Sequence, residues 1–213
     1  MAKMKEYANC VALLADLVGS RLGDRTRSHA AVLDAIEVTN AAVPALDPLR
    51  VTVGDELQGI YGSLGEAFRA GWSLRAALLG VADLRFGLGG GEVRVVDAER
   101  GIQDGSAWYL AREAIAWVEG LSDDPGYRSV RTAVRDERPM ATPAADALVR
   151  LVEAAAAGLR PGTRRSLQGL LDGLDNATVA QREGISPSAN SQRVNSNGLR
   201  VLADAVAALG ELP

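Results

Sequence analysis

Apolar positions along the chain form short runs and longer helical spacings, separated by polar stretches. Runs of about four to eight apolar or alternating residues predict strands, and apolar residues three and four apart predict helices. The predicted elements are strand 10–15, helix 26–43, strands 49–53 and 57–61 joined by a Gly-Asp hairpin, helix 64–79, strand 84–96 and helix 107–118. This β-α-β-β-α-β order followed by a helix is the split βαβ, ferredoxin-like arrangement.

The pattern changes after residue 120. Residues 121–142 are rich in Asp, Pro, Arg and Gly, which is typical of a linker or connecting arm. Further helices are predicted over 143–158 and 163–171, followed by two short helices joined at Gly184. We therefore expect an α+β fold: a ferredoxin-like domain over 1–122, a linker or arm over 123–142 and a small all-α domain over 143–213.

Composition narrows the class of protein. The 213 residues are 47% hydrophobic and 23% charged, the balance of a soluble globular protein. Cys10 is the only cysteine and lies in an apolar run, so a reducing cytoplasm is the expected compartment. No apolar stretch is long enough to predict a membrane span. With one cysteine and one histidine, His29, the chain excludes a zinc site, a Ser-His-Asp triad and a Cys-His pair.

The net charge of −4 argues against a protein that binds polyanions over its whole surface. From Met140 onward the chain has seven Arg and seven Asp plus Glu, so this third is neutral. Any contact with DNA from that region would gain little affinity from counterion release.

Two acids, Asp16 and Asp55, stand where apolar strands stop. A sheet could bring both carboxylates to one edge, where they suit a hard cation such as Mg²⁺ that also binds a substrate phosphate. They could instead be strand-end acids that face water. Glu56 is either a third acid at this site or a solvated hairpin residue.

Two other features allow two interpretations each. Arg21 and Arg85 are candidates for phosphate contacts or ordinary surface arginines. The glycines between residues 87 and 91 either cradle a phosphate through their N–H groups or loosen a strand beside a helix.

Residues 8–118 resemble the SatD family and, more distantly, class III nucleotidyl cyclases. Asp16 and Gly54-Asp55 match the two metal-binding positions of a cyclase, residues 84–93 resemble its Gly-x-x-x-Gly-Glu-Val strand, and residues 105–113 resemble its following helix. The resemblance implies a nucleotidyl cyclase-like fold and Mg²⁺ or Mn²⁺ at Asp16 and Asp55. The residues it places at the nucleotide are Leu17, Gly19, Ser20, Arg21, Gly54, Glu56, Arg85 and Arg112.

The chain departs from the cyclase pattern on the last of these helices. Tyr109 stands where a cyclase has its transition-state asparagine, and Glu113 stands where it has the arginine that steadies the triphosphate. Arg112 is one residue earlier, which is about 100° of rotation on a helix. Class III cyclases also build their site from two subunits, so we expect a homodimer. Trp108, Tyr109 and Trp117 are its candidate interface residues, unless they pack inside the chain.

The tail carries a second resemblance. Residues 177–188 have the spacing of a helix-turn-helix and resemble region 4 of sigma-70-type factors, with Gly184 at the turn, Ser186 as N-cap and Pro187 at the first helical position. Asn190 occupies a position that such motifs usually fill with an aliphatic residue. The candidate DNA-contacting side chains of the second helix are Ser188, Ser191, Gln192, Arg193 and Asn195.

Together these features favour a cytoplasmic DNA-binding regulator whose N-terminal domain binds a nucleotide with a divalent metal. One alternative is an active nucleotidyl cyclase or nucleotidyltransferase that uses the two aspartates, with the tail as a protein-contact module. A cyclase-like dimerisation scaffold without activity is the third interpretation.

Overall fold

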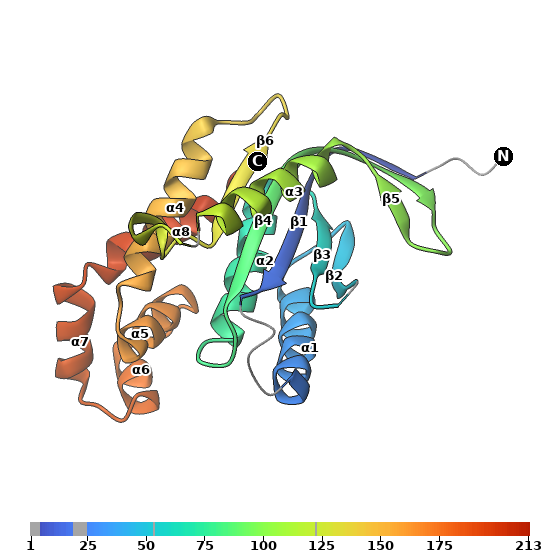
Figure 1. The fold of residues 1–213 in the computed structure, drawn as a ribbon. Coiled ribbons are helices and arrows are strands. Elements are labelled where there is room, and N and C mark those ends of the chain that lie inside the picture. The colour runs from blue at the N-terminus through green and yellow to red at the C-terminus, as the bar shows by residue number, and fades with distance from the viewer. Residues whose placement is uncertain (1–4, 19–24, 53, 122) are drawn as a thin grey trace.

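The computed structural model describes residues 5–18, 25–52, 54–121 and 123–213 (Figure 1). The α/β half contains β1 (Glu6–Leu17), α1 (Arg25–Ala42), β2 (Asp47–Val51), β3 (Leu57–Tyr61), α2 (Leu64–Ala77), β4 (Leu84–Asp97), β5 (Ile102–Asp104) and α3 (Ser106–Gly120). It is followed by the 3-10 turn η1 (Pro125–Tyr127), β6 (Thr132–Asp136), α4 (Pro143–Ala157), α5 (Pro161–Leu171), α6 (Asn176–Arg182), α7 (Pro187–Ser196) and α8 (Leu199–Gly210). The mixed α+β class and the β-α-β-β-α-β order of the first half are confirmed.

The sheet runs in the order β2-β3-β1-β4-β5, and each neighbouring pair is antiparallel. Two interleaved split βαβ units produce this order of the first four strands, since each unit leaves room for one strand of the other. The long strand β1 lies in the centre, with Val11 opposite Tyr61 of β3 and Asp16 opposite Arg85 of β4.

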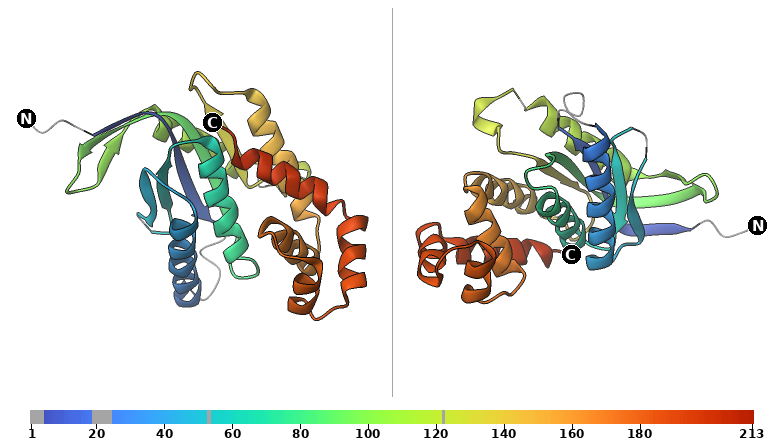
Figure 2. Two further views of the ribbon diagram at one scale, coloured as in Figure 1. Left: turned by 180° about the vertical axis from the view of Figure 1, so that it is seen from behind. Right: turned by 90° about the horizontal axis from the view of Figure 1, so that it is seen from below.

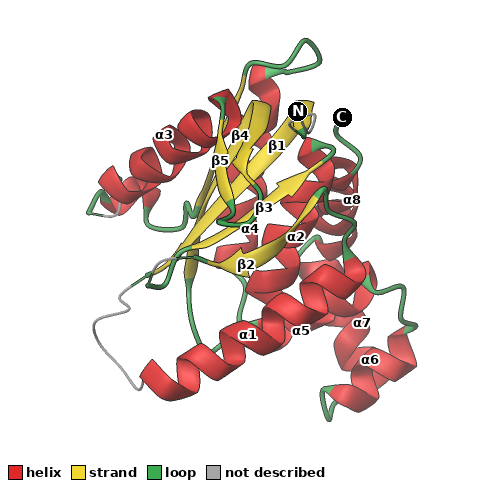
Figure 3. Cartoon of the chain, turned by 90° about the vertical axis from the view of Figure 1, so that its right-hand side faces the viewer, coloured by secondary structure: helices red, strands yellow, loops and turns green. Residues whose placement is uncertain are grey.

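Alternate residues of β1 enter two different cores, as expected for a strand with both faces covered. Val11, Leu13 and Ala15 pack in the cluster that includes residues of α1 and α2. Cys10, Ala12 and Leu14 pack against α3 on the opposite face. Figure 3 shows α3 on one side of the sheet and α1 and α2 on the other.

The glycines of β4 serve helix packing. A Cβ added at Gly87 would lie 2.1 Å from the carbonyl oxygen of Ala111, and one added at Gly89 would lie 2.1 Å from that of Ala107. The α3 backbone therefore rests directly on β4, at positions where only glycine leaves enough space. Of the two interpretations of this segment, the loosened strand beside a helix agrees with the structure.

Residues 123–142, expected to be a linker or connecting arm, supply a strand to the sheet. β6 pairs in parallel with β4, from Phe86 opposite Thr132 to Gly90 opposite Asp136. The short apolar sequence of this strand is surrounded by arginines and acids, which hides it in the sequence pattern.

The helical half is joined to the α/β half through a shared core. Val149 and Val152 of α4 and Val206 and Leu209 of α8 belong to the same apolar cluster as β1 and α2. A separate all-α domain is therefore not confirmed (Figure 2). None of the described helices combines the length and the apolar character needed to cross a membrane.

The end of α8 packs closely on the start of α2. A Cβ at Gly65 would lie 2.2 Å from the carbonyl oxygen of Gly210. The N–H groups of Leu64 and Gly65 donate to the carbonyls of Pro213 and Leu212, at 3.1 and 2.9 Å. The first turn of α2 thus finds acceptors nearly 150 residues further along the chain.

Candidate functional site

Asp16 lies at the end of β1 and forms a two-point ion pair with Arg85 of β4. Arg85 Nε lies 2.9 Å from Asp16 Oδ1, and Arg85 Nη2 lies 3.2 Å from Oδ2. Glu119 of α3 approaches the same guanidinium at 3.4 Å. Partial burial raises the pKa of Asp16, although Arg85 opposes this, and the neighbouring Glu119 and Asp55 raise the pKa slightly further.

The β2–β3 hairpin brings a second acid–arginine pair to the same edge of the sheet. Gly54 has φ +71°, a left-handed conformation that suits glycine, and the Thr52 N–H donates to the Glu56 carbonyl at 2.9 Å. The Glu56 carboxylate accepts two hydrogen bonds from the Arg112 guanidinium of α3, at 2.6 and 3.0 Å. The hydrogen bonds to Glu56 raise the pKa of Arg112, and the charge of Asp16 adds to this effect.

The structure therefore brings together seven of the residues predicted to surround a metal and a nucleotide: Asp16, Leu17, Gly54, Asp55, Glu56, Arg85 and Arg112. Gly19, Ser20 and Arg21 lie outside the described residues. The sequence did not predict that Asp16 and Glu56 each have their own arginine, because these partners are 69 and 56 residues away.

The donor set limits which cation this edge could hold. Asp16 and Asp55 offer hard carboxylate oxygens, but no group of three or more Asp, Glu, His or Cys side chains forms a metal cage in the described part of the chain. Two carboxylates fit a Mg²⁺-type ion that keeps several waters and shares phosphate oxygens. They do not fit a cation held by protein ligands alone.

The two α3 residues that differ from the cyclase pattern have other partners. The Tyr109 hydroxyl donates to Asp104, and Glu113 accepts from Arg135 at 3.2 Å. Tyr109 is 66% exposed, whereas Trp108 and Trp117 are partly buried against the apolar clusters beneath α3. Of the three candidate interface residues, only Tyr109 is free to meet another subunit.

In the tail, α6 and α7 are joined by a tight turn with Gly184 at φ +63°. The Ser186 hydroxyl caps α7 by accepting from the Ala189 N–H at 3.1 Å, as predicted. Asn190 is buried, accepts from the Ser166 hydroxyl at 2.8 Å and donates to Asn176 at 2.9 Å. These bonds provide partners for both polar atoms of the buried Asn190 amide.

Four of the candidate DNA-contacting side chains are exposed on α7: Ser188, Ser191, Gln192 and Asn195. The fifth, Arg193, turns toward the protein, where it donates to the Gly162 carbonyl at 3.2 Å and to Glu183 at 3.3 Å. Arg165 also binds Glu183, at 2.6 Å. Arg193 therefore links α5, α6 and α7 in this structure.

The SatD family model matches residues 10–209. The chain belongs to the SatD family. The match includes the helical half, so the family covers more of the chain than residues 8–118. No curated protein matches this SatD-family chain in sequence.

Solved structures give weak likenesses. The monomeric guanylyl cyclase domain of the RhoGC fusion protein from Blastocladiella emersonii has a TM-score of 0.43 at 15% identity, over 54% of this chain and 78% of that one. The guanylyl cyclase Cya2 has a TM-score of 0.38 at 14% identity, over 54% and 72%. A regulator of polyketide synthase expression from Bifidobacterium adolescentis has a TM-score of 0.29 at 14% identity, over 98% and 82%.

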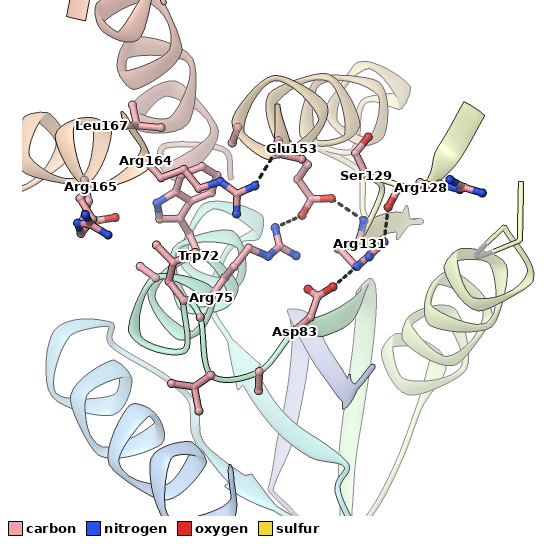
Figure 4. Close-up of a pocket in the computed structure, with 18 residues that line it drawn as sticks. Trp72, Arg75, Asp83, Arg128, Ser129, Arg131, Glu153, Arg164, Arg165 and Leu167 are labelled. Carbon is pink, nitrogen blue, oxygen red and sulfur yellow. Dashed lines mark hydrogen bonds and ion pairs between the residues drawn. The ribbon is translucent and has the colours of Figure 1, made fainter. Parts of the chain in front are cut away.

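A second polar cluster of this SatD-family chain was not predicted. Glu153 of α4 is buried among α2, β6 and the loop before β6, beside a cavity of about 520 Å³ (Figure 4). The only sequence signal was an acid among the alanines that follow Leu151, and such a residue resembles an ordinary solvent-facing position.

Proposed function

We propose that this SatD-family protein binds a nucleoside triphosphate together with a divalent cation at the Asp16–Asp55 edge of the sheet, as a signal rather than as a substrate. The observation that supports this is the arrangement of two acid–arginine pairs beside Asp55. Such an edge offers ligands for both parts of a metal–triphosphate complex.

Binding would exchange one set of ion pairs for another. The cation takes carboxylate oxygens from Asp16 and Asp55, and the phosphates take the guanidinium groups of Arg85 and Arg112. Asp16 and the two arginines each exchange a protein partner for one on the ligand, whereas Glu56 gives up Arg112 and is left to solvent.

Binding without cyclisation is favoured by α3. Tyr109 and Glu113, at the positions that resemble the cyclase asparagine and arginine, are bonded to Asp104 and Arg135. The alternative, a cyclase or nucleotidyltransferase, predicts pyrophosphate release from ATP or GTP with Mn²⁺. Release that is lost in Asp55→Asn would establish the enzyme in place of the sensor.

The test of binding is thermal unfolding with Mg²⁺ or Mn²⁺ and a non-hydrolysable triphosphate. We expect the melting temperature of the wild type to rise by several degrees only when both are present, because a ligand that binds the folded state stabilises it. Asp55→Asn should remove the rise, and Asp34→Asn, a change at an exposed acid of α1, should keep it. The proposal fails if the wild type shows no rise with any triphosphate.

A second candidate function, DNA binding by the tail, is favoured by the exposed polar face of α7. Gln192 and Asn195 carry amides of the kind that read adenine, and Ser188 and Ser191 share their exposure. A neutral region binds DNA weakly as a single copy, so useful affinity would need a homodimer on a spaced site.

The test is a gel shift on the protein's own promoter fragment at low salt. Gln192→Ala with Asn195→Ala should abolish the shift, and Gln181→Ala on the exposed part of α6 should not. Arg193 is unsuitable for this test, because its removal also breaks the contacts with Gly162 and Glu183. No shift by the wild type on any genomic fragment would leave the tail as a protein-contact module.

A further inference from the structure

A cavity of about 520 Å³ lies between the two halves of the molecule. Its walls come from α2, the loop from α2 to β4, the approach to β6, and helices α4 and α5 (Figure 4). Trp72, Leu79 and Leu167 are among its apolar lining residues. This size and composition are typical of a site for a small organic molecule.

The carboxylate of Glu153, the buried acid beside the cavity, binds only groups of the protein within the described residues. The Glu153 side chain is only 2% exposed. It accepts from the main-chain N–H groups of Arg131 and Thr132, each at 2.9 Å, from the Thr132 hydroxyl and from Arg75. Its carboxylate is therefore not available to neutralise any further cation.

The arginines around the cavity differ in their partners. Arg75 binds Glu153, Arg131 binds Asp83 at 2.7 Å, and Arg165 binds Glu183. The Arg128 side chain points away from the cavity in Figure 4. These four arginines leave Arg164 as the remaining cation among the lining residues.

Arg164 has no acidic partner in the described part of the chain. It donates only to the main-chain carbonyls of Ala157 and Leu159, at 2.6 and 3.1 Å. A guanidinium has five N–H donors, so Arg164 keeps donors and a whole positive charge for another group.

Two more donors beside the cavity lack a partner. Trp72 Nε1 and Arg75 Nε are buried and make no hydrogen bond within the described residues. A buried donor without an acceptor destabilises the folded state, and each such group in a native structure calls for an explanation.

We propose that this cavity binds a small organic anion with an apolar body. Its carboxylate, phosphate or sulfonate group pairs with Arg164, and its aromatic or aliphatic body packs against Trp72 and Leu79. The cavity shares no lining residue with the nucleotide site. Because α2 and α5 form facing walls, an occupant contacts both halves of the molecule at once.

The probe for the test is 8-anilinonaphthalene-1-sulfonate, an aromatic anion whose fluorescence rises in apolar sites. We expect one binding site per chain, and binding at least about tenfold weaker for the uncharged analogue N-phenyl-1-naphthylamine. Arg164→Gln should weaken binding of the sulfonate probe by a similar factor. Arg160→Gln, at an exposed position that does not line the cavity, should leave this binding unchanged.

A second pair of variants tests the location. Ala76→Phe places a ring into the cavity from α2 and should abolish binding, whereas Ala77→Phe, one exposed position further along, should not. In an NMR spectrum the indole N–H signal of Trp72, assigned from Trp72→Phe, should move on titration while those of Trp108 and Trp117 stay. Equal binding by wild type, Arg164→Gln and Ala76→Phe, or a Trp72 signal that does not move, would overturn the proposal.

Discussion

Single side chains at the sheet edge decide how the site would respond to a ligand. Glu56 holds Arg112 and so competes with any phosphate for it. We expect Glu56→Gln to strengthen triphosphate binding by roughly 1.4- to fivefold, since an exposed ion pair contributes about 0.2–1 kcal/mol. Isothermal titration calorimetry measures the change. Weaker binding would instead make Glu56 a third acid at the metal.

The matched control for that experiment is Glu113→Gln on the same helix. Glu113 also pairs with an arginine, Arg135, at 3.2 Å, but outside the Asp16–Asp55 edge. Removal of the Glu113 charge releases Arg135, which does not lie beside the nucleotide, so the binding constant for the triphosphate should not change.

Cys10 is the residue whose chemistry burial alters most plainly. Its side chain is 0% exposed, and burial raises the pKa of the thiol to about 11. The reactive thiolate is therefore scarce at pH 8. We expect Ellman's reagent to leave the native protein unmodified for hours at pH 8 and to modify one thiol at once in guanidinium chloride. Rapid reaction of the native protein would mean that β1 opens readily.

At the scale of elements, the contact between β4 and α3 depends on glycine. We expect Gly89→Ala to destabilise the fold by about 3 kcal/mol or more, because its Cβ would lie 2.1 Å from the Ala107 carbonyl oxygen and α3 would have to move. Gly120→Ala, at the end of α3 with no atom within 4 Å of the added carbon, is the control and should be neutral or stabilising. Urea unfolding compares the two variants.

The junction of α5, α6 and α7 should depend on pH. Hydrogen bonds and charge from Arg165, with Arg193 adding to them, lower the pKa of Glu183. The unfolded chain then binds a proton more readily than the folded one as the pH falls through 4.5. The stabilising contribution of Glu183 is therefore present at neutral pH and is lost at lower pH.

Between pH 7 and pH 4 the free energy of unfolding should fall less for Glu183→Gln than for the wild type. Urea unfolding at the two pH values measures the difference. Glu211→Gln, a change at an exposed acid of the same charge type, is the control. If the free energy of unfolding falls by the same amount in Glu183→Gln as in the wild type, the prediction is contradicted.

Elements with a strong local pattern could be predicted from the sequence, and those defined by distant partners could not. β3 and the start of β4 were placed at their observed bounds, because their apolar residues alternate or run continuously. β5 and β6 were missed, since each has only three to five residues and gains its stability from pairing with β4. In the same way, Asp16 and Asp55 could be found as strand-end acids, but the pairing of Asp16 with Arg85 and of Glu56 with Arg112 could not.

For the whole molecule, the sequence predicted two domains where the structure has a shared core. Apolar spacing shows that the α4 and α8 helices have a buried face, but not which surface covers it. That surface is α2 and β6. The cavity around Arg164 was hidden for the same reason, since its walls come from segments up to 96 residues apart, from Trp72 to Gln168.

The contact between Gly65 and Gly210 has a consequence for how the chain is made. Ribosomes add about 5–20 residues per second, so α2 waits roughly 7–30 s before the segment that covers its first turn has been synthesised. During that interval its apolar side and its uncapped N–H groups are open to water and to other chains. A chain that stopped short of its last four residues would leave the N–H groups of Leu64 and Gly65 without these acceptors.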